Sequence, residues 1–63
     1  MTIVLRDTDE NGHAYEVMTF ANVQHASEYR DTLVYALETE TDRSTIWDMQ
    51  DAIRQIEEQL NDI

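Results

Sequence analysis

The most regular hydrophobic pattern in this chain lies at its C-terminal end, over residues 44–63. Its apolar residues recur at steps of three and four, at Ile46, Met49, Ile53, Ile56, Leu60 and Ile63. This spacing places them on one stripe of an α-helix. Thr45 followed by Asp48 three residues later is a variant of the capping box, and Ser44 is the competing N-cap. The pattern therefore predicts a helix over residues 44–63 with one face to bury.

A second helical pattern precedes it over residues 22–38, with Asn22 as the predicted N-cap. Its expected buried positions are Val23, Ala26, Tyr29, Leu33, Ala36 and Leu37, with Val34 at the margin. The polar stretch between the two helical patterns is only a few residues long. A connection this short predicts that the two helices are antiparallel neighbours.

The first part of the chain has the pattern of a β-hairpin over residues 2–21. Residues 2–8 and 14–21 are rich in β-branched and apolar side chains, which favours strands. Asn11-Gly12 lies between them and is typical of a type I′ turn, in which both central residues have positive φ. A two-residue loop of this kind pairs Glu10 with His13.

The same register predicts which residues face each other further along the hairpin. Leu5 is expected opposite Met18, and Ile3 opposite Phe20, on the face that packs inward. The other face is expected to carry Val4, Arg6, Thr8, Tyr15, Val17 and Thr19. The register also places Glu16 opposite Asp7.

Together these elements predict one small α+β domain over residues 1–63. Its order is ββαα, with a two-stranded antiparallel hairpin packed on two antiparallel helices. Two strands alone leave both sheet edges unpaired. Either a second copy extends the hairpin to a four-stranded sheet, or the helices cover one face and leave the edges to solvent.

The size of the chain favours self-association. A core in a 63-residue domain rarely supplies more than about 3–5 kcal/mol, and the absence of cysteine excludes disulfides and thiolate metal sites. We therefore expect a homodimer or higher oligomer. The candidate interface is the stripe of residues 44–63, together with Trp47 and Tyr35, two aromatic residues that lie off the apolar stripes. In the alternative interpretation, the stripe packs only within its own chain.

The charge is strongly one-sided, with fourteen Asp and Glu against four Arg and a net charge of −10. This balance argues against direct binding to nucleic acid or to an anionic membrane, because both require a basic surface. It favours a basic partner, such as a protein that itself binds DNA or RNA. The absence of lysine also fits a second explanation, adaptation to high salt, where screening removes the repulsion.

Several acidic residues are predicted to share the outward side of the second helix, namely Asp48, Asp51, Glu58 and Asp62. A row of carboxylates can imitate phosphates, so one alternative function is a phage-type nucleic-acid mimic that inhibits a DNA- or RNA-binding host protein. The other interpretation is a solvated helix face in an acidic protein.

The run Asp7-x-Asp9-x-Asn11-Gly12 matches the first half of a calcium-binding loop. The bidentate Glu that such a loop needs six residues after the glycine is replaced by Met18. Because the predicted register brings Glu16 opposite Asp7, residues Asp7, Asp9, Asn11 and Glu16 form a weak candidate cation site. We expect no other metal site and no cofactor.

No pattern of catalytic residues is apparent. His13 and His25 have no nucleophile or metal-ligand partner at a usable spacing, and there is no Gly-rich phosphate loop. No signal peptide or membrane span is visible, so the expected location is the cytoplasm of a prokaryote or of a virus-infected host cell. The sequence therefore predicts a non-enzymatic, acidic interaction module.

Overall fold

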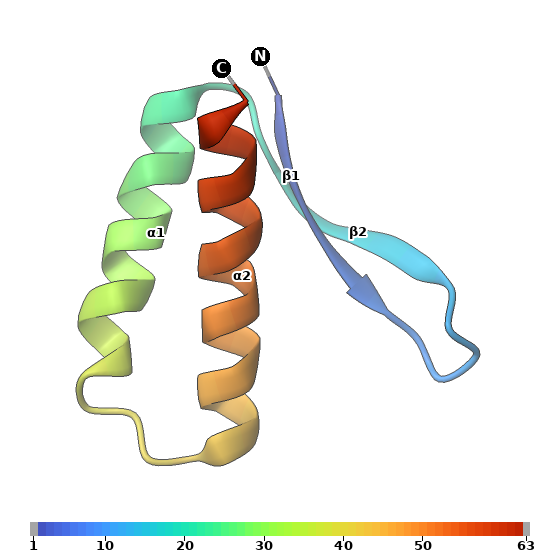
Figure 1. The fold of residues 1–63 in the computed structure, drawn as a ribbon, viewed down its shortest axis with the longest axis vertical. Coiled ribbons are helices and arrows are strands. Elements are labelled where there is room, and N and C mark those ends of the chain that lie inside the picture. The colour runs from blue at the N-terminus through green and yellow to red at the C-terminus, as the bar shows by residue number, and fades with distance from the viewer. Residues whose placement is uncertain (1, 63) are drawn as a thin grey trace.

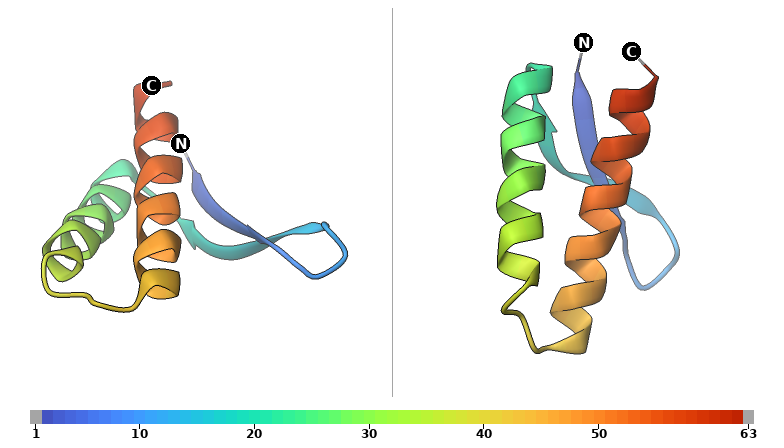
Figure 2. Two further views of the ribbon diagram at one scale, coloured as in Figure 1. Left: turned by 60° about the horizontal axis from the view of Figure 1, so that its bottom comes forward. Right: turned by 60° about the vertical axis from the view of Figure 1, so that its left-hand side comes forward.

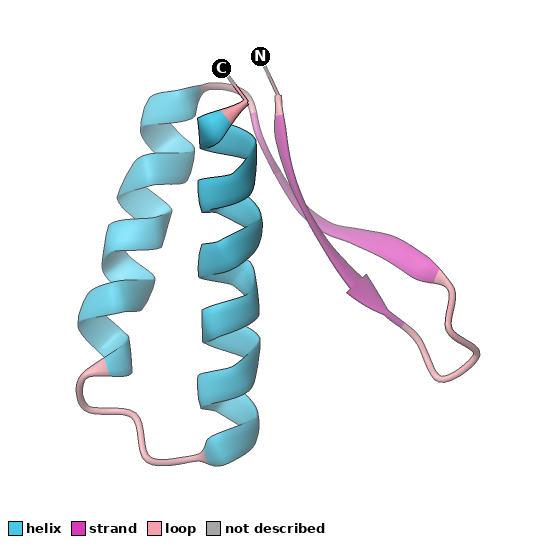
Figure 3. Cartoon of the chain, viewed as in Figure 1, coloured by secondary structure: helices cyan, strands magenta, loops and turns pink. Residues whose placement is uncertain are grey.

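The computed structural model describes residues 2–62 and has the predicted element order. Strands β1 (Ile3–Thr8) and β2 (Ala14–Phe20) form an antiparallel hairpin, followed by helices α1 (Val23–Leu37) and α2 (Arg43–Asn61). The two helices run antiparallel side by side, and the hairpin packs against them at one end (Figures 1 and 3). The prediction of a small α+β domain is confirmed.

The helix N-termini follow from side-chain capping. Asn22 has an extended backbone, and its side-chain oxygen accepts a hydrogen bond from the His25 N–H at 2.9 Å, as predicted. At α2, however, the cap is Asp42, whose carboxylate accepts from the N–H groups of Ser44 and Thr45 at 2.9 and 3.3 Å. The prediction of Ser44 or Thr45 as N-cap is wrong, because the carboxylate of Asp42 already binds their amides and the helix begins at Arg43.

The hairpin loop differs from the predicted two-residue turn. Among the described residues only Gly12 has positive φ, at 82°, so Asn11 does not adopt the conformation that a type I′ turn requires. The Gly12 N–H donates to the Asp9 carbonyl and the Asp9 N–H to the His13 carbonyl, each at 3.0 Å. The loop is therefore a tight turn of three residues closed by a left-handed glycine. One carboxylate oxygen of Asp9 also accepts from the N–H groups of Asn11 and His13, which stabilises this longer loop.

The extra loop residue is compensated by a bulge further along β2. Near the loop, Asp7 pairs with Tyr15 and Arg6 with Glu16, so the predicted pairing of Asp7 with Glu16 is wrong. Between Leu5 and Arg6 the register shifts by one, which leaves Val17 as an extra residue on β2. Beyond the bulge, the two predicted inward-facing pairs are confirmed: Leu5 with Met18 and Ile3 with Phe20.

The core is small and lies where the first half of β1 crosses the helical pair. Its buried residues are Ile3, Leu5, Ala26 and Ile56. The residues packed against them are only partly buried: Phe20, Val23, Tyr29, Ala52 and Leu60. The rings of Phe20 and Tyr29 lie 5.3 Å apart and extend this core between β2 and α1. On α1, Ala36 was expected in the buried stripe but is exposed.

Beyond this core, large apolar side chains remain uncovered. The half of the hairpin next to the loop projects away from both helices, as Figures 1 and 2 show from three directions. As a result Tyr15, Val17 and Met18 are exposed, and Met18 does not reach the core that its inward register predicted. The molecule is consequently flat, with extents of 32 × 31 × 16 Å. Among the described residues, no helix is both long and apolar enough to cross a membrane.

The capping of α2 can be tested directly. Asp42→Ala removes the acceptor of two amide hydrogen bonds and should lower the free energy of unfolding by about 0.5–2 kcal/mol in urea denaturation. Thr45→Ala is the matched control and should have a smaller effect, because Thr45 occupies the first turn and does not cap it. A larger loss of stability for Thr45→Ala than for Asp42→Ala would instead support Thr45 as the N-cap, as the sequence pattern predicted.

Candidate functional site

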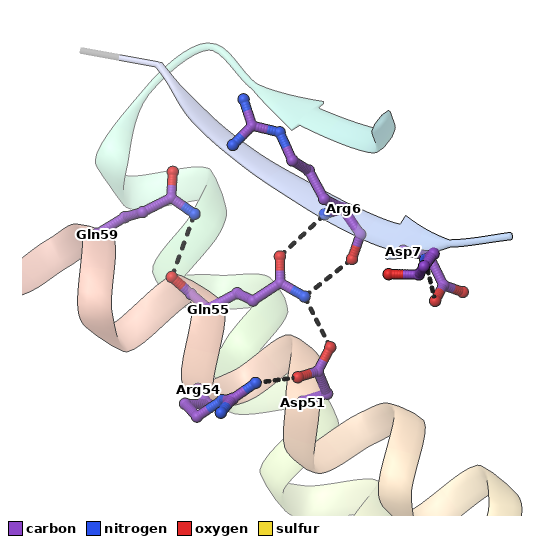
Figure 4. A network of polar contacts seen from close by, with 7 residues as sticks. Arg6, Asp7, Asp51, Arg54, Gln55 and Gln59 are labelled. Carbon is purple, nitrogen blue, oxygen red and sulfur yellow. Dashed lines mark hydrogen bonds and ion pairs between the residues drawn. The ribbon is translucent and has the colours of Figure 1, made fainter. Parts of the chain in front are cut away.

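The edge of β1 that faces away from β2 is closed by two glutamine side chains from α2. Figure 4 shows the bonds between Gln55 and Arg6. Gln59 accepts from the Val4 N–H at 3.0 Å and donates to the Val4 carbonyl at 2.8 Å. Gln55 makes the same pair of bonds with the N–H and carbonyl of Arg6, both at 2.9 Å. Each side-chain amide thus occupies the place of a peptide group on a neighbouring strand.

This arrangement depends on a match between helix and strand repeats. Four residues along a helix rise about 6 Å, and two residues along a strand rise about 6.6 Å. Gln55 and Gln59 are four residues apart, so their side chains meet Val4 and Arg6, which are two residues apart and point their backbone groups to the same side. The next outward N–H of β1, that of Thr8, donates to the Asp7 carboxylate at 2.8 Å.

A short polar network orients Gln55. Its Nε2 donates to Asp51 Oδ2 at 2.7 Å, and the other oxygen of Asp51 binds Arg54. Gln59 Nε2 also donates to the Gln55 backbone carbonyl at 3.1 Å. Because the glutamines are held at more than one point, less side-chain entropy remains to be lost when they bind β1.

The edge of β2 is different. In an antiparallel pair, residues that face each other direct their backbone groups either toward or away from one another. Val4 and Arg6 direct theirs away from β2 toward the glutamines, so their partners Thr19 and Glu16 direct theirs to the opposite edge. Within residues 2–62, no side-chain hydrogen bond reaches the backbone of β2 comparable to those that close β1. The sheet therefore has one closed edge and one open edge.

The residues predicted as an oligomer interface fall into three groups. Among residues 2–62, Tyr35 and Trp47 are the most exposed large hydrophobic side chains, at 77% and 75%. Ile46, Met49, Ile53 and Leu60 are half-buried. Ile56 is fully buried in the core of its own chain and offers no surface to a partner. Ile63 lies outside the described residues.

Trp47 stands beside an open surface depression lined by Arg43, Ser44, Ile46 and Asp48. All of these residues belong to the first turns of α2, so one helix end alone forms the depression. The depression is an open, largely apolar surface next to an exposed aromatic ring. It is not an enclosed ligand pocket.

The predicted acidic face is only partly free. Asp51 is bound by Arg54 and Gln55, and it therefore supports the closed edge. Asp48, Glu58 and Asp62 are all exposed, and Asp48 also lies at the rim of a groove between the hairpin and α2. On the side facing α1, Glu57 lies 3.8 Å from the guanidinium of Arg30.

The groove between the hairpin and the helices has an apolar floor and an acidic rim. Leu5, Val17, Tyr29 and Ala52 line it, with Asp7, Asp48 and Asp51 among its polar neighbours. Val17 was expected on the outer face and reaches this side because the bulge interrupts the alternation of β2. The groove encloses about 170 Å³, less than the roughly 300 Å³ at which ligand pockets usually begin.

The candidate cation site does not form as predicted. Glu16 faces Arg6, and Asp7 faces Tyr15, so the two carboxylates occupy successive pairs and point to opposite faces. Asp9 uses a carboxylate oxygen to bind the loop amides of Asn11 and His13. Within residues 2–62 there is no group of three or more His, Asp or Glu side chains that could hold a metal ion.

The sequence interpretation missed Gln55 and Gln59. The available signal was their spacing, since two long amides four residues apart lie beside the apolar stripe of a helix that must pack near a strand. Because an amide carries both a donor and an acceptor, it can satisfy both backbone groups of one strand residue. The spacing becomes informative only once β1 is known to lie against this side of α2.

Gln59→Ala should destabilise the fold. The substitution leaves the N–H and carbonyl of Val4 without their partners and should lower the free energy of unfolding by about 1–3 kcal/mol. Gln50→Ala is the matched control, a glutamine on an exposed position of the same helix, and should change stability by less than about 0.5 kcal/mol. Equal effects of the two substitutions in urea denaturation would contradict the role assigned to Gln59.

Gln55→Glu should make stability depend on pH more strongly than in the parent chain. A glutamate here keeps one oxygen for the Arg6 N–H, but its second oxygen faces the Arg6 carbonyl and Asp51, which both repel the charged form, so we expect its pKa to be raised on folding. A raised pKa means that stability is greatest at low pH and is lost as pH rises through the folded pKa. Relative to the parent chain, the urea midpoint of the variant should therefore fall more between pH 4 and pH 7.

No family model, no curated protein and no solved structure matches this chain. Its function must therefore be inferred from the geometry of its own residues.

Proposed function

We propose that this protein is a non-enzymatic interaction module that works as a homo-oligomer. The observation that carries this proposal is the imbalance between its core and its exposed apolar surface. Only four side chains are buried among residues 2–62. In contrast, six large hydrophobic residues are exposed: Tyr15, Val17, Met18, Val34, Tyr35 and Trp47.

The energetics support association. Burial of apolar surface contributes about 25 cal/mol per Å², and it must offset the loss of chain entropy on folding. A core centred on Ile3, Leu5, Ala26 and Ile56 buries little apolar surface for a 63-residue chain, so the favourable free energy of burial is small. A second copy that covers the remaining apolar side chains adds stability that one chain cannot supply.

Charge opposes this association and gives it a distinctive salt dependence. Each copy carries a net charge of −10, so two copies repel each other at low ionic strength. Screening weakens that repulsion and leaves apolar burial almost unchanged. Self-association should therefore strengthen as salt increases.

The acidic face gives the nucleic-acid-mimic alternative less support. Of its four residues, Asp51 is engaged by Arg54 and Gln55, which leaves Asp48, Glu58 and Asp62 exposed. A contact between Glu58 or Asp62 and a basic partner is weakened by salt, opposite to the behaviour expected of self-association. The salt dependence of binding therefore distinguishes self-association from nucleic-acid mimicry.

Light scattering coupled to size exclusion should give a mass of at least twice 7.4 kDa at micromolar concentration in about 0.15 M salt. The oligomer fraction should increase when the salt is raised to about 1 M, where the Debye length falls to about 3 Å. A folded monomer under both conditions would exclude the proposal.

A further inference from the structure

We infer that a second copy of the chain pairs antiparallel with the open edge of β2. The result is a four-stranded sheet of order β1-β2-β2-β1, closed at both outer edges by Gln55 and Gln59. This inference rests on the proposed self-association and specifies the surface that mediates it. Three independent features of the hairpin support it.

The first feature is the asymmetry of the two sheet edges. The outward backbone groups of Val4 and Arg6 are satisfied by glutamine side chains, and the outward N–H of Thr8 by Asp7. Those of Glu16 and Thr19 on β2 have no comparable partner within the described residues. An unpaired edge is a template for another strand, and here only one of the two edges is available.

The second feature is charge. The chain contains fourteen acidic residues, but β2 contributes a single one, Glu16, among its seven positions. Glu16 faces Arg6 across the hairpin, which offsets its charge. Two copies with net charge −10 can approach most closely where each carries the least charge, and the β2 edge is such a surface.

The third feature is the set of side chains beside this edge. Val17 and Met18 are exposed in the middle of β2, and Tyr15 follows toward the loop. The chain carries neither lysine nor proline on this strand, the two residues that proteins use to protect open edges. Burial of these side chains against their copies removes apolar surface that the helices do not cover.

One register satisfies the exposed backbone groups of both copies. When Glu16 of one copy faces Thr19 of the other, the outward groups of both residues meet on each side of a two-fold axis. Val17 then lies beside Met18 of the other copy, and the two Glu16 side chains do not face each other. An isologous interface of this kind requires only one self-complementary segment.

Thr19→Pro tests the edge directly. Proline removes the outward N–H of Thr19 but none of the bonds between β1 and β2, because Thr19 and Val4 do not bond each other in this geometry. We expect the dissociation constant of the dimer to rise about tenfold or more, measured by sedimentation equilibrium. Thr19→Val is the matched control, since it keeps the N–H at an exposed position and should leave the constant within about threefold.

Amide hydrogen exchange of the unmodified chain provides a second measurement that does not depend on a variant folding. Exchange is carried out above and below the dissociation constant, quenched, and measured residue by residue by NMR. The amides of Glu16 and Thr19 should be protected only at the higher concentration, whereas those of Val4 and Arg6 should be protected at both.

The outcomes separate this inference from the broader proposal. A chain that remains monomeric contradicts the proposed self-association itself. A chain that associates, but whose Glu16 and Thr19 amides exchange equally at both concentrations, overturns the edge pairing alone. If Tyr35→Ala or Trp47→Ala then weakens the oligomer while Thr19→Pro does not, the helical surface is the interface.

Discussion

The hydrogen bonds from Gln55 and Gln59 to the backbone of β1 determine how the hairpin is held on the helices. They join residues separated by about fifty positions in the sequence and satisfy both backbone groups of Val4 and Arg6. Without a partner, the half-buried peptide groups of Val4 would cost about 1–3 kcal/mol, a large fraction of what so small a domain can supply. The apolar contact of Ile3 and Leu5 with Ile56 gives the attraction, and the glutamines fix its direction and register.

This attachment has a consequence for the rest of the molecule. With β1 fixed along α2, the loop half of the hairpin extends beyond the helical pair and cannot cover it (Figure 1). Tyr15, Val17 and Met18 of β2 and Trp47 of α2 therefore remain exposed. One constraint accordingly accounts for the small core, the flat shape and the apolar surface available to a partner.

Asp51 illustrates how the same residue has different meanings in sequence and in structure. In the sequence it belongs to an acidic row that suggests a phosphate mimic. In the structure its two oxygens bind Arg54 and Gln55, so it helps to orient an edge-closing glutamine. An acidic residue in the sequence is not necessarily available to a partner, because polar side chains of the same chain can already bind its carboxylate.

The sequence by itself determined the local features of this protein. Hydrophobic period predicted both helices, and two β-branched, apolar runs around Asn11-Gly12 predicted the hairpin. Asn22 caps α1 as expected, because capping depends on contacts within a few residues. Only the tertiary structure decided the bulge at Val17 and the closure of β1 by glutamines from α2, whereas the cap at Asp42 is a local contact that the choice of Ser44 or Thr45 missed. The loop can close with two or three residues, and the three-residue form persists here because Asp9 binds its amides and the bulge restores the inward pairing of Leu5 and Ile3. Which edge of the hairpin remains open depends on where a distant helix packs, and no pattern local to the strands contains that information.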